Sequence, residues 1–329
     1  MVQPEVSAAW RLFSFNWAVL GLMALALAVG LPLSGFSIKL SSMMLPFGIC
    51  GAYVLVAYYK ARRLDDGDPM VVFVLGSTGQ VLLIPVLMTP LTYIAASANL
   101  PMQDVTLYAL DHALGLDWFT YFKFIYDRHA LLTATVWAYA MIGWPTFGIP
   151  VVLGITRRYR RLQEFTLAFA LALIVTTIIS TFVPAMGAYD LLNYLPDPDV
   201  FLPRAYVDYL VEMPQVRDGT LRELDMAQLG GIVTFPSFHA AAAALYLWAL
   251  WDVRWMRPIA LVANVGMILA TPVVGGHYFV DVFAGIAVAA LAVIAARQIT
   301  GRLMRTSPTP RDVVPASSGV LAAARQTDD

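Results

Sequence analysis

The chain has 329 residues, of which 59% are hydrophobic and only 13% are charged, and its formal net charge is -1. Soluble domains carry about 25% charged residues, so this composition excludes an ordinary soluble enzyme and indicates a protein embedded in lipid. The near-zero charge argues against a nucleic-acid partner, and the single cysteine, Cys50, excludes an intrachain disulfide.

Eight stretches are apolar enough to cross a membrane. They lie at residues 14–34, 41–59, 71–97, 131–155, 165–187, 237–252, 256–275 and 278–299. The first is too long for the apolar part of a signal peptide and has no clear cleavage site, so we expect it to be an uncleaved anchor. The sequence therefore predicts an all-α polytopic membrane protein with eight transmembrane helices.

Basic residues follow every second stretch, and this alternation predicts the orientation of the chain. The residues concerned are Lys60, Arg62, Arg63, Arg157, Arg158, Arg160, Arg161, Arg254, Arg257, Arg297, Arg302 and Arg305. Loops rich in Lys and Arg stay in the cytoplasm, so we expect both termini there. The segments 98–130 and 188–236, and all four histidines, are then extracytoplasmic.

Three segments outside the apolar stretches have distinct compositions. Residues 101–129 have an amphipathic spacing, which predicts a helix that lies along the membrane interface. Residues 190–235 are acidic, which is consistent either with a solvated loop or with a polar lid over a binding site. The end of the chain, 306–329, is rich in Ser, Thr, Pro and Ala and is expected to be a disordered cytoplasmic tail.

Two short motifs carry most of the chemical information. In the first, Ser237 follows Pro236 and is a good N-cap for the sixth apolar helix, which puts His239 in the first turn, beside free backbone N–H groups. In the second, two glycines precede His277, and Asp281 follows four residues later. On a helix these two side chains would share one face, so the carboxylate could orient the imidazole as a nucleophile.

These motifs resemble a known family. Pro236-Ser237-x-His239, followed by His277-x-x-x-Asp281, is similar to the second and third signature motifs of the type 2 phosphatidic acid phosphatase superfamily. The forms Phe-Pro-Ser-Phe-His and His-Tyr-Phe-x-Asp most resemble the branch that contains fungal inositol phosphorylceramide synthase and many bacterial proteins. The run 216–222 is also typical of bacterial members, so a bacterial inner membrane is the expected location.

The resemblance implies a division of the chain and a set of roles. Two additional transmembrane helices (1–69) would precede a six-helix catalytic core (70–305) and the tail (306–329). His277 would attack phosphorus to give a phosphohistidine, Asp281 would orient it, and His239 would act as acid and then base. Ser237 would bind the substrate phosphate. No metal or cofactor is implied, and the partners are lipids with phosphate head groups in the bilayer.

The sequence also departs from the superfamily pattern. The first motif, Lys-x6-Arg-Pro, is expected near the end of the fifth stretch, but residues 181–187 contain no base. The Ser-Arg that usually precedes the third-motif histidine is replaced by Ala270 and Thr271. Arg217 and Arg222 are the best substitutes on the same side, so we predict that they bind phosphate. Fewer cations favour a singly charged phosphodiester, and hence transfer of a head group to a lipid hydroxyl.

Three alternatives stay open at this point. A lipid phosphate phosphatase of the same superfamily would release phosphate from a phosphatidic acid or a prenyl (di)phosphate. A non-enzymatic lipid transporter could also use eight helices, although no inverted repeat is visible and the ionisable residues lie at helix ends. Finally, two histidines and an aspartate could form a three-ligand metal site.

Overall fold

The computed structural model describes residues 2–62, 69–198, 200–201 and 204–305. Its elements confirm the all-α prediction, because seven helical segments of the described chain are long and apolar enough to cross a membrane. They are α1 (Val2–Leu33), α2 (Leu40–Ala61), α3 (Met70–Ala96), α6 (His129–Ala140) continued by η1 (Met141–Gly143) and α7 (Trp144–Ile155), α8 (Tyr159–Phe182), η2 (Arg254–Met256) continued by α12 (Arg257–Val274), and α13 (Phe279–Arg305).

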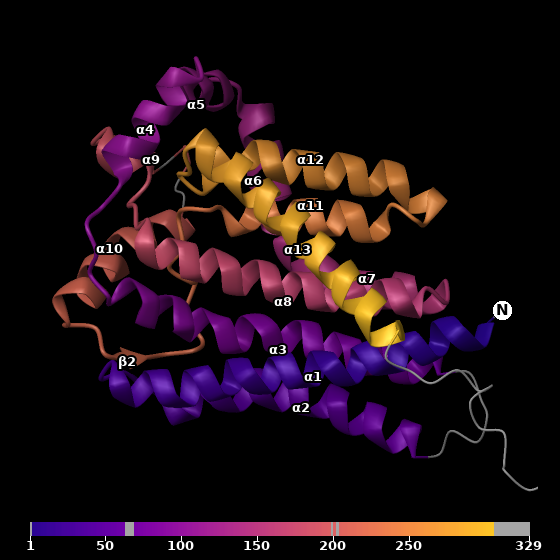
Figure 1. The fold of residues 1–329 in the computed structure, drawn as a ribbon. Coiled ribbons are helices and arrows are strands. Elements are labelled where there is room, and N and C mark those ends of the chain that lie inside the picture. The colour runs from indigo at the N-terminus through magenta and orange to yellow at the C-terminus, as the bar shows by residue number, and fades with distance from the viewer. Residues whose placement is uncertain (1, 63–68, 199, 202–203, 306–329) are drawn as a thin grey trace, which may run out of the picture.

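These helices form an antiparallel bundle around α8 (Figure 1). Helix α8 packs against α1, α3, α11 and α13, whereas α2 packs mainly on α3 at the edge of the bundle. Many large apolar side chains of α2, such as Met44 and Leu55, are exposed, as expected for a helix that faces lipid. The start of α1 and the end of α13 lie at the same end of the bundle, where Arg11 donates a hydrogen bond of 2.9 Å to the Leu303 carbonyl.

A buried polar network joins the first helix to the core. The Asn16 side-chain amide of α1 donates to the Gln163 side-chain oxygen at 3.1 Å, and the Gln163 amide donates to the Ser77 hydroxyl at 2.7 Å. All three side chains are buried. Such hydrogen bonds between helices are favourable in lipid, where no water competes, so they fix the register of α1, α3 and α8.

The predicted sixth span differs from the other seven in that its helix is short. Helix α11 (Phe238–Leu250) has only 13 residues. At about 1.5 Å per residue it is about 20 Å long, less than the roughly 30 Å of a hydrocarbon core. The extended segment that precedes it borders a cavity at Gly230, Gly231, Val233 and Thr234. Within a membrane, non-helical backbone is tolerated only where protein covers it or where it borders a cavity.

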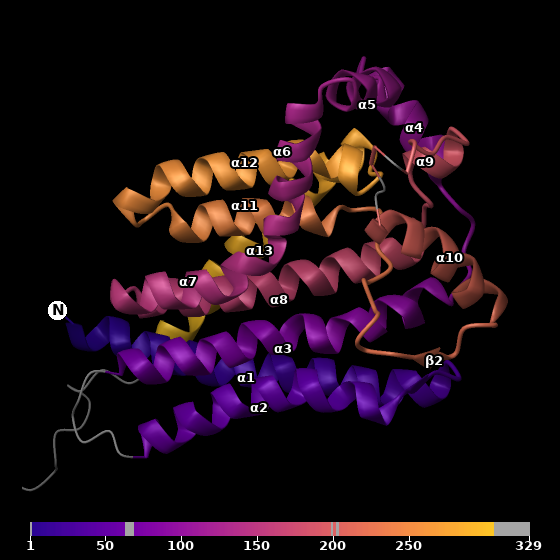
Figure 2. The ribbon, with the colours of Figure 1, turned by 180° about the vertical axis from the view of Figure 1, so that it is seen from behind.

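The fourth predicted span is interrupted. Residues 129–155 form α6 and α7 with one turn of 3-10 helix between them. Pro145 has no N–H to donate to the Met141 carbonyl, so a continuous α-helix would lack a hydrogen bond there. Seen from behind, α6 crosses α12, while α7 runs on toward α3 and α8 (Figure 2).

The longer segments between the spans gather at the end of the bundle opposite to the N-terminus (Figure 1). The predicted interfacial helix is in fact two helices, α4 (Asp104–Ala113) and α5 (Trp118–Tyr126), separated by Gly115 at a φ of 73°. The acidic segment is not a plain loop, because it contains α9 (Ala188–Leu191) and α10 (Arg204–Asp218). The predicted tail, 306–329, lies outside the described residues.

A two-residue strand pair, which the sequence did not indicate, ties this end together. Strand β1 (Ser37–Ile38) pairs in parallel with β2 (Glu223–Leu224). Beside it, Lys39 forms a salt bridge of 3.2 Å with Asp225. The loop between α1 and α2 is thereby fixed to the segment that leads into α11.

Candidate active site

Ser237 starts α11 as predicted. Its backbone is extended, and its hydroxyl oxygen accepts a hydrogen bond from the backbone N–H of Ala240 at 3.4 Å, so the predicted N-cap is confirmed. The side chain is fully buried. The cap puts His239 in the first turn of α11, where it borders the main cavity of the molecule.

His277 and Asp281 meet, but not on one face of a helix as the spacing suggested. Helix α13 begins at Phe279, so His277 lies in the loop before it and Asp281 lies in its first turn. His277 Nδ1 is 3.2 Å from Asp281 Oδ2, and the same oxygen accepts the Tyr278 N–H at 2.9 Å. With Nδ1 held by the carboxylate, Nε2 is the ring nitrogen left for attack on a substrate.

The two motifs are joined through their backbones. The N–H of Ser237 donates to the Asp281 carbonyl at 3.0 Å. Helices α11 and α13 approach closely because Gly285 faces the start of α11, and a Cβ there would lie 2.2 Å from the Ser237 carbonyl oxygen. Small residues allow this kind of contact in membrane helix pairs. The Ser237–His239 motif and the His277–Asp281 motif therefore form one rigid unit.

Two buried carboxylates of α4 hold the loop that carries His277. Asp111 accepts the N–H groups of Phe279 and Val280, both at 2.8 Å, and so caps α13. Asp104 accepts the Tyr278 hydroxyl at 2.9 Å, and also the N–H groups of Met186 and Gly187. Burial raises the pKa of Asp111, and its two backbone hydrogen bonds act in the opposite direction. These aspartates of the predicted interfacial segment therefore support the loop that carries His277.

Replacing Asp111 by alanine is expected to destabilise the protein and to reduce its activity. Two buried N–H groups at the start of α13 would lose their acceptor, and each such group costs about 1–3 kcal/mol. Asp111→Asn keeps one acceptor oxygen and should have an intermediate effect. The measurements are the melting temperature in detergent and lipid turnover. Asp127→Asn is the control, because Asp127 is an exposed carboxylate beside the same group of helices. Wild-type stability and turnover in Asp111→Ala would show that the cap is dispensable.

One cavity of about 580 Å³ contains both histidines. Its walls come from α3, α6, η1, α7, α8, α10 and α11, and from the loops before α11 and α13. The lining residues are Leu82, Pro85, Thr89, Thr92, Tyr139, Ala140, Ile142, Gly143, Thr146, Phe169, Leu173, Tyr206, Tyr209, Gly230, Gly231, Val233, Thr234, Phe238, His239, Tyr246, Gly275 and His277. No Lys or Arg of the described chain is among them. The cavity extends past His239 to Tyr246, two turns further along α11.

The two arginines predicted to bind phosphate do not border this cavity. Arg222 donates to the Val216 carbonyl at 2.8 Å, and its guanidinium lies over the Phe36 ring at 4.6 Å. Arg217 donates to the Leu100 carbonyl at 2.9 Å and borders a second pocket with Asp190 and Asp218. Both arginines therefore have contacts that stabilise the extramembrane segments. The Lys and Arg of the superfamily's first motif were expected near residues 181–187. In their place, the backbone N–H groups of residues 186 and 187 bind Asp104.

Helix α10, within the acidic segment, covers part of the cavity. Tyr206 and Tyr209 of α10 are both lining residues. The Tyr209 hydroxyl donates to the Ala185 carbonyl and accepts from the Thr234 hydroxyl at 3.0 Å, while the Tyr206 hydroxyl accepts the Asp190 N–H at 3.0 Å. Of the two interpretations of this segment, these contacts favour a lid.

Comparison with known proteins agrees with this geometry. No curated protein and no solved structure matches the chain. A family model described as the PAP2 superfamily matches residues 105–295. The matched range contains His239, His277 and Asp281, Asp111 of α4 and the lid helix. Since the match covers more than half of the 329 residues, the chain belongs to the PAP2 superfamily, whose members are typically phosphatases or phosphotransferases.

Proposed function

We propose that the protein is an integral-membrane lipid phosphotransferase that moves a phosphate-bearing head group onto a lipid hydroxyl, as in the branch of inositol phosphorylceramide synthase. The observation that carries this proposal is the cavity, which contains His239 and His277 but no Lys or Arg of the described chain. A phosphomonoester dianion would lack a cation there. A phosphodiester has one negative charge and requires less neutralisation.

The proposed reaction has two displacements at phosphorus. His277 Nε2 attacks, the bond from phosphorus to the leaving oxygen breaks, and His239 donates its proton to that oxygen. The acceptor hydroxyl then gives its proton to His239 and attacks the phosphohistidine, and the bond between phosphorus and nitrogen breaks. Asp281 stabilises the imidazolium character that develops on His277 through the 3.2 Å contact at Nδ1. Both histidines end in their starting state.

The depth of the cavity supports a lipid substrate. It continues past His239 to Phe169, Leu173 and Tyr246, side chains in the apolar parts of α8 and α11. A phosphate at the histidines would therefore be next to water-accessible loops, while an acyl or prenyl chain would continue among apolar side chains. In this proposal, the reacting phosphate lies at a boundary between polar and apolar surroundings.

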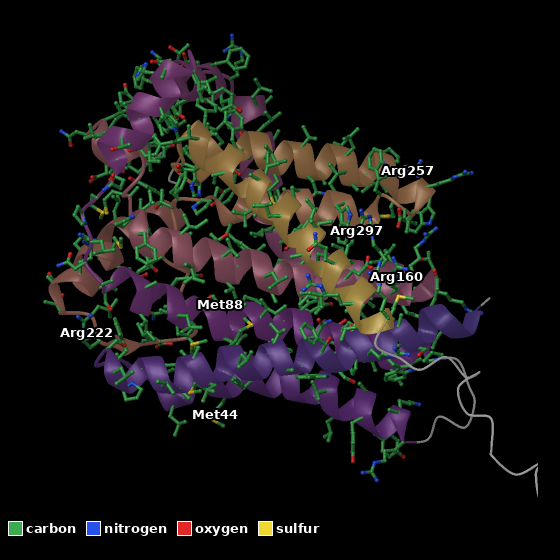
Figure 3. The ribbon with its side chains drawn as sticks, in the orientation of Figure 1. Met44, Met88, Arg160, Arg222, Arg257 and Arg297 are labelled. Carbon is green, nitrogen blue, oxygen red and sulfur yellow. The ribbon has the colours of Figure 1, made fainter. Side chains whose placement is uncertain are left out.

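We further propose that the site faces the extracytoplasmic leaflet. Arg160, Arg257 and Arg297 lie toward one end of the bundle and Arg222 at the other, as Figure 3 shows. The end rich in arginine is expected in the cytoplasm. The start of α11 and the start of α13, which carry the motifs, are at the opposite end (Figure 1). This orientation gives both termini the cytoplasmic location predicted from the sequence.

A lipid-product experiment tests the proposal. Purified protein is incubated with a total bacterial lipid extract in the presence of a chelator, and free phosphate and lipid species are followed by mass spectrometry. We expect new phospholipid species without matching phosphate release, and His277→Ala is the inactive control. Stoichiometric phosphate release without a new lipid ester would contradict transfer and leave the phosphatase.

The chelator tests the alternative that the site binds a metal ion. Among the described residues, no group of three or more His, Cys, Asp and Glu side chains is arranged to hold a metal ion. We therefore expect turnover to continue in chelator. Loss of turnover that one divalent cation restores would support the metal site instead, and a protein that leaves every lipid unchanged would support the transporter.

A further inference from the structure

A site without Lys or Arg requires other groups to bind the phosphoryl oxygens. Four tyrosines border the cavity, and three of their hydroxyls already have partners. Tyr209 donates to the Ala185 carbonyl, Tyr246 donates to the Ile142 carbonyl at 3.1 Å, and Tyr206 accepts the Asp190 N–H. The fourth is Tyr139 of α6, whose hydroxyl forms no hydrogen bond with the described residues.

The Tyr139 ring lies directly on His239. Their ring centroids are 3.9 Å apart and the ring planes differ by only 11°. Within the described chain, no hydrogen bond orients the imidazole of His239, so this stack contributes to holding its plane. Stacking contacts between aromatic rings are favourable.

The Tyr139 hydroxyl and His277 both lie beside Gly275. A Cβ built on Gly275 would lie 2.8 Å from the Tyr139 hydroxyl oxygen and 2.6 Å from His277 Cδ2. Both groups therefore pack against Gly275 and leave no room for a side chain there, so they lie close to each other. A phosphoryl group attacked by His277 would occupy the neighbourhood of this hydroxyl.

We propose that Tyr139 is a further catalytic residue, whose hydroxyl donates a hydrogen bond to a non-bridging phosphoryl oxygen during transfer. This inference rests on the proposed function, since it requires that phosphorus reacts at His277. A fixed donor directed at oxygen atoms where charge develops stabilises the transition state. Tyr139 remains protonated throughout, so the proton balance of the two histidines does not change.

The Tyr139 hydroxyl is a neutral donor, and this affects which substrate the site would favour. It stabilises an oxygen anion without cancelling its charge, and it gains less from a second negative charge than a Lys or Arg would, so a site that relies on it is better suited to a singly charged phosphoryl group. The resemblance to the superfamily implies that the Lys and Arg of its first motif bind phosphate, and this chain lacks both. Here, the ring and hydroxyl of Tyr139 combine the orientation of His239 with recognition of a phosphodiester.

Tyr139→Phe tests this role because it keeps the ring and removes only the hydroxyl. Orthovanadate, which mimics the five-coordinate phosphorus of the transition state, is used as the probe, and its affinity is measured from the rise in melting temperature in detergent. We expect Tyr139→Phe to melt like the wild type without vanadate and to bind vanadate about 10- to 100-fold more weakly, the effect of losing a hydrogen bond to a charged group. Tyr58→Phe, on the lipid-facing helix α2, is the matched control and should bind vanadate normally.

The outcomes separate this inference from the proposed function. If wild-type protein binds vanadate in a manner that requires His277, and Tyr139→Phe binds it equally well, the role of Tyr139 is wrong and the phosphohistidine mechanism stands. If wild-type protein does not bind vanadate, the proposed function itself fails. If Tyr139→Phe melts at a lower temperature than the wild type without vanadate, a second variant is needed. Tyr139→Leu removes both the hydroxyl and the ring that stacks on His239, and the loss of lipid turnover is compared between the two variants. Equal losses in both variants would contradict a specific role for the hydroxyl.

Discussion

Replacing His277 by alanine is expected to abolish lipid turnover. The imidazole is the proposed nucleophile, and within the described chain no other side chain of the cavity is paired with a carboxylate as His277 is with Asp281. Asp281→Asn should reduce turnover by about ten-thousand-fold, because an amide in this position favours the wrong tautomer of the imidazole. The rates are measured with purified protein under saturating lipid.

The matched control for this prediction is His112→Ala. His112 is an exposed histidine of α4 that packs against Tyr108 and does not border the cavity. Its replacement should leave turnover unchanged. Near-normal turnover by purified His277→Ala protein would refute the proposed mechanism, whichever lipid is the substrate.

Replacing Gly285 by alanine is expected to damage both stability and activity. The added methyl group would lie 2.2 Å from the Ser237 carbonyl oxygen and 3.2 Å from the Ala241 N, so α11 and α13 would have to move apart. Overpacking of this kind costs about 1–3 kcal/mol. The same movement would separate His239 from His277, so turnover should fall by more than the loss of folded protein explains.

The control for Gly285→Ala lies on the same helix. Gly301 of α13 has no atom within 4 Å of the position of an added Cβ, so Gly301→Ala should melt at the wild-type temperature or higher. Melting temperature in detergent and turnover per folded protein are measured for both variants. A Gly285→Ala protein with normal melting temperature and turnover would show that this helix contact does not determine the geometry of the site.

Much of the fold could be predicted from the sequence, because lipid restricts the possible structures. The long apolar stretches form helices with similar bounds, for example 256–275 against Arg257–Val274. The N-cap at Ser237 was predictable because the cap and the helix start are local features. The contact of His277 with Asp281 was predictable from their spacing, although the helix begins only at Phe279.

Features that depend on distant parts of the chain could not be predicted in this way. Arg217 and Arg222 lie at the same end of the bundle as the two motifs, as expected. The sequence could not show that their partners are the carbonyls of Leu100 and Val216, respectively. Tyr139 lies in an apolar stretch, where a tyrosine is usually an interfacial anchor, so its stack on His239 was not visible.

One missed feature did have a signal in the sequence. Asp104, Leu107 and Asp111 are spaced three and four residues apart, so they share one face of α4, and all three are buried. Two carboxylates on the apolar face of an interfacial helix indicate buried partners. Here the partners are backbone N–H groups, at the start of α13 for Asp111 and at residues 186–187 for Asp104. Their role at the site could have been proposed from this spacing.

Modification of His277 during turnover tests the mechanism most directly. Wild-type protein is incubated with the lipid extract and quenched at alkaline pH, where phosphohistidine survives. It is then digested, and the peptide that contains His277 is examined by tandem mass spectrometry. We expect a phosphoryl group on His277, still carrying its head group if the donor is a diester, and no modification in His277→Ala. A phosphoryl group on another residue of the wild-type protein, or turnover by His277→Ala, would contradict catalysis through His277.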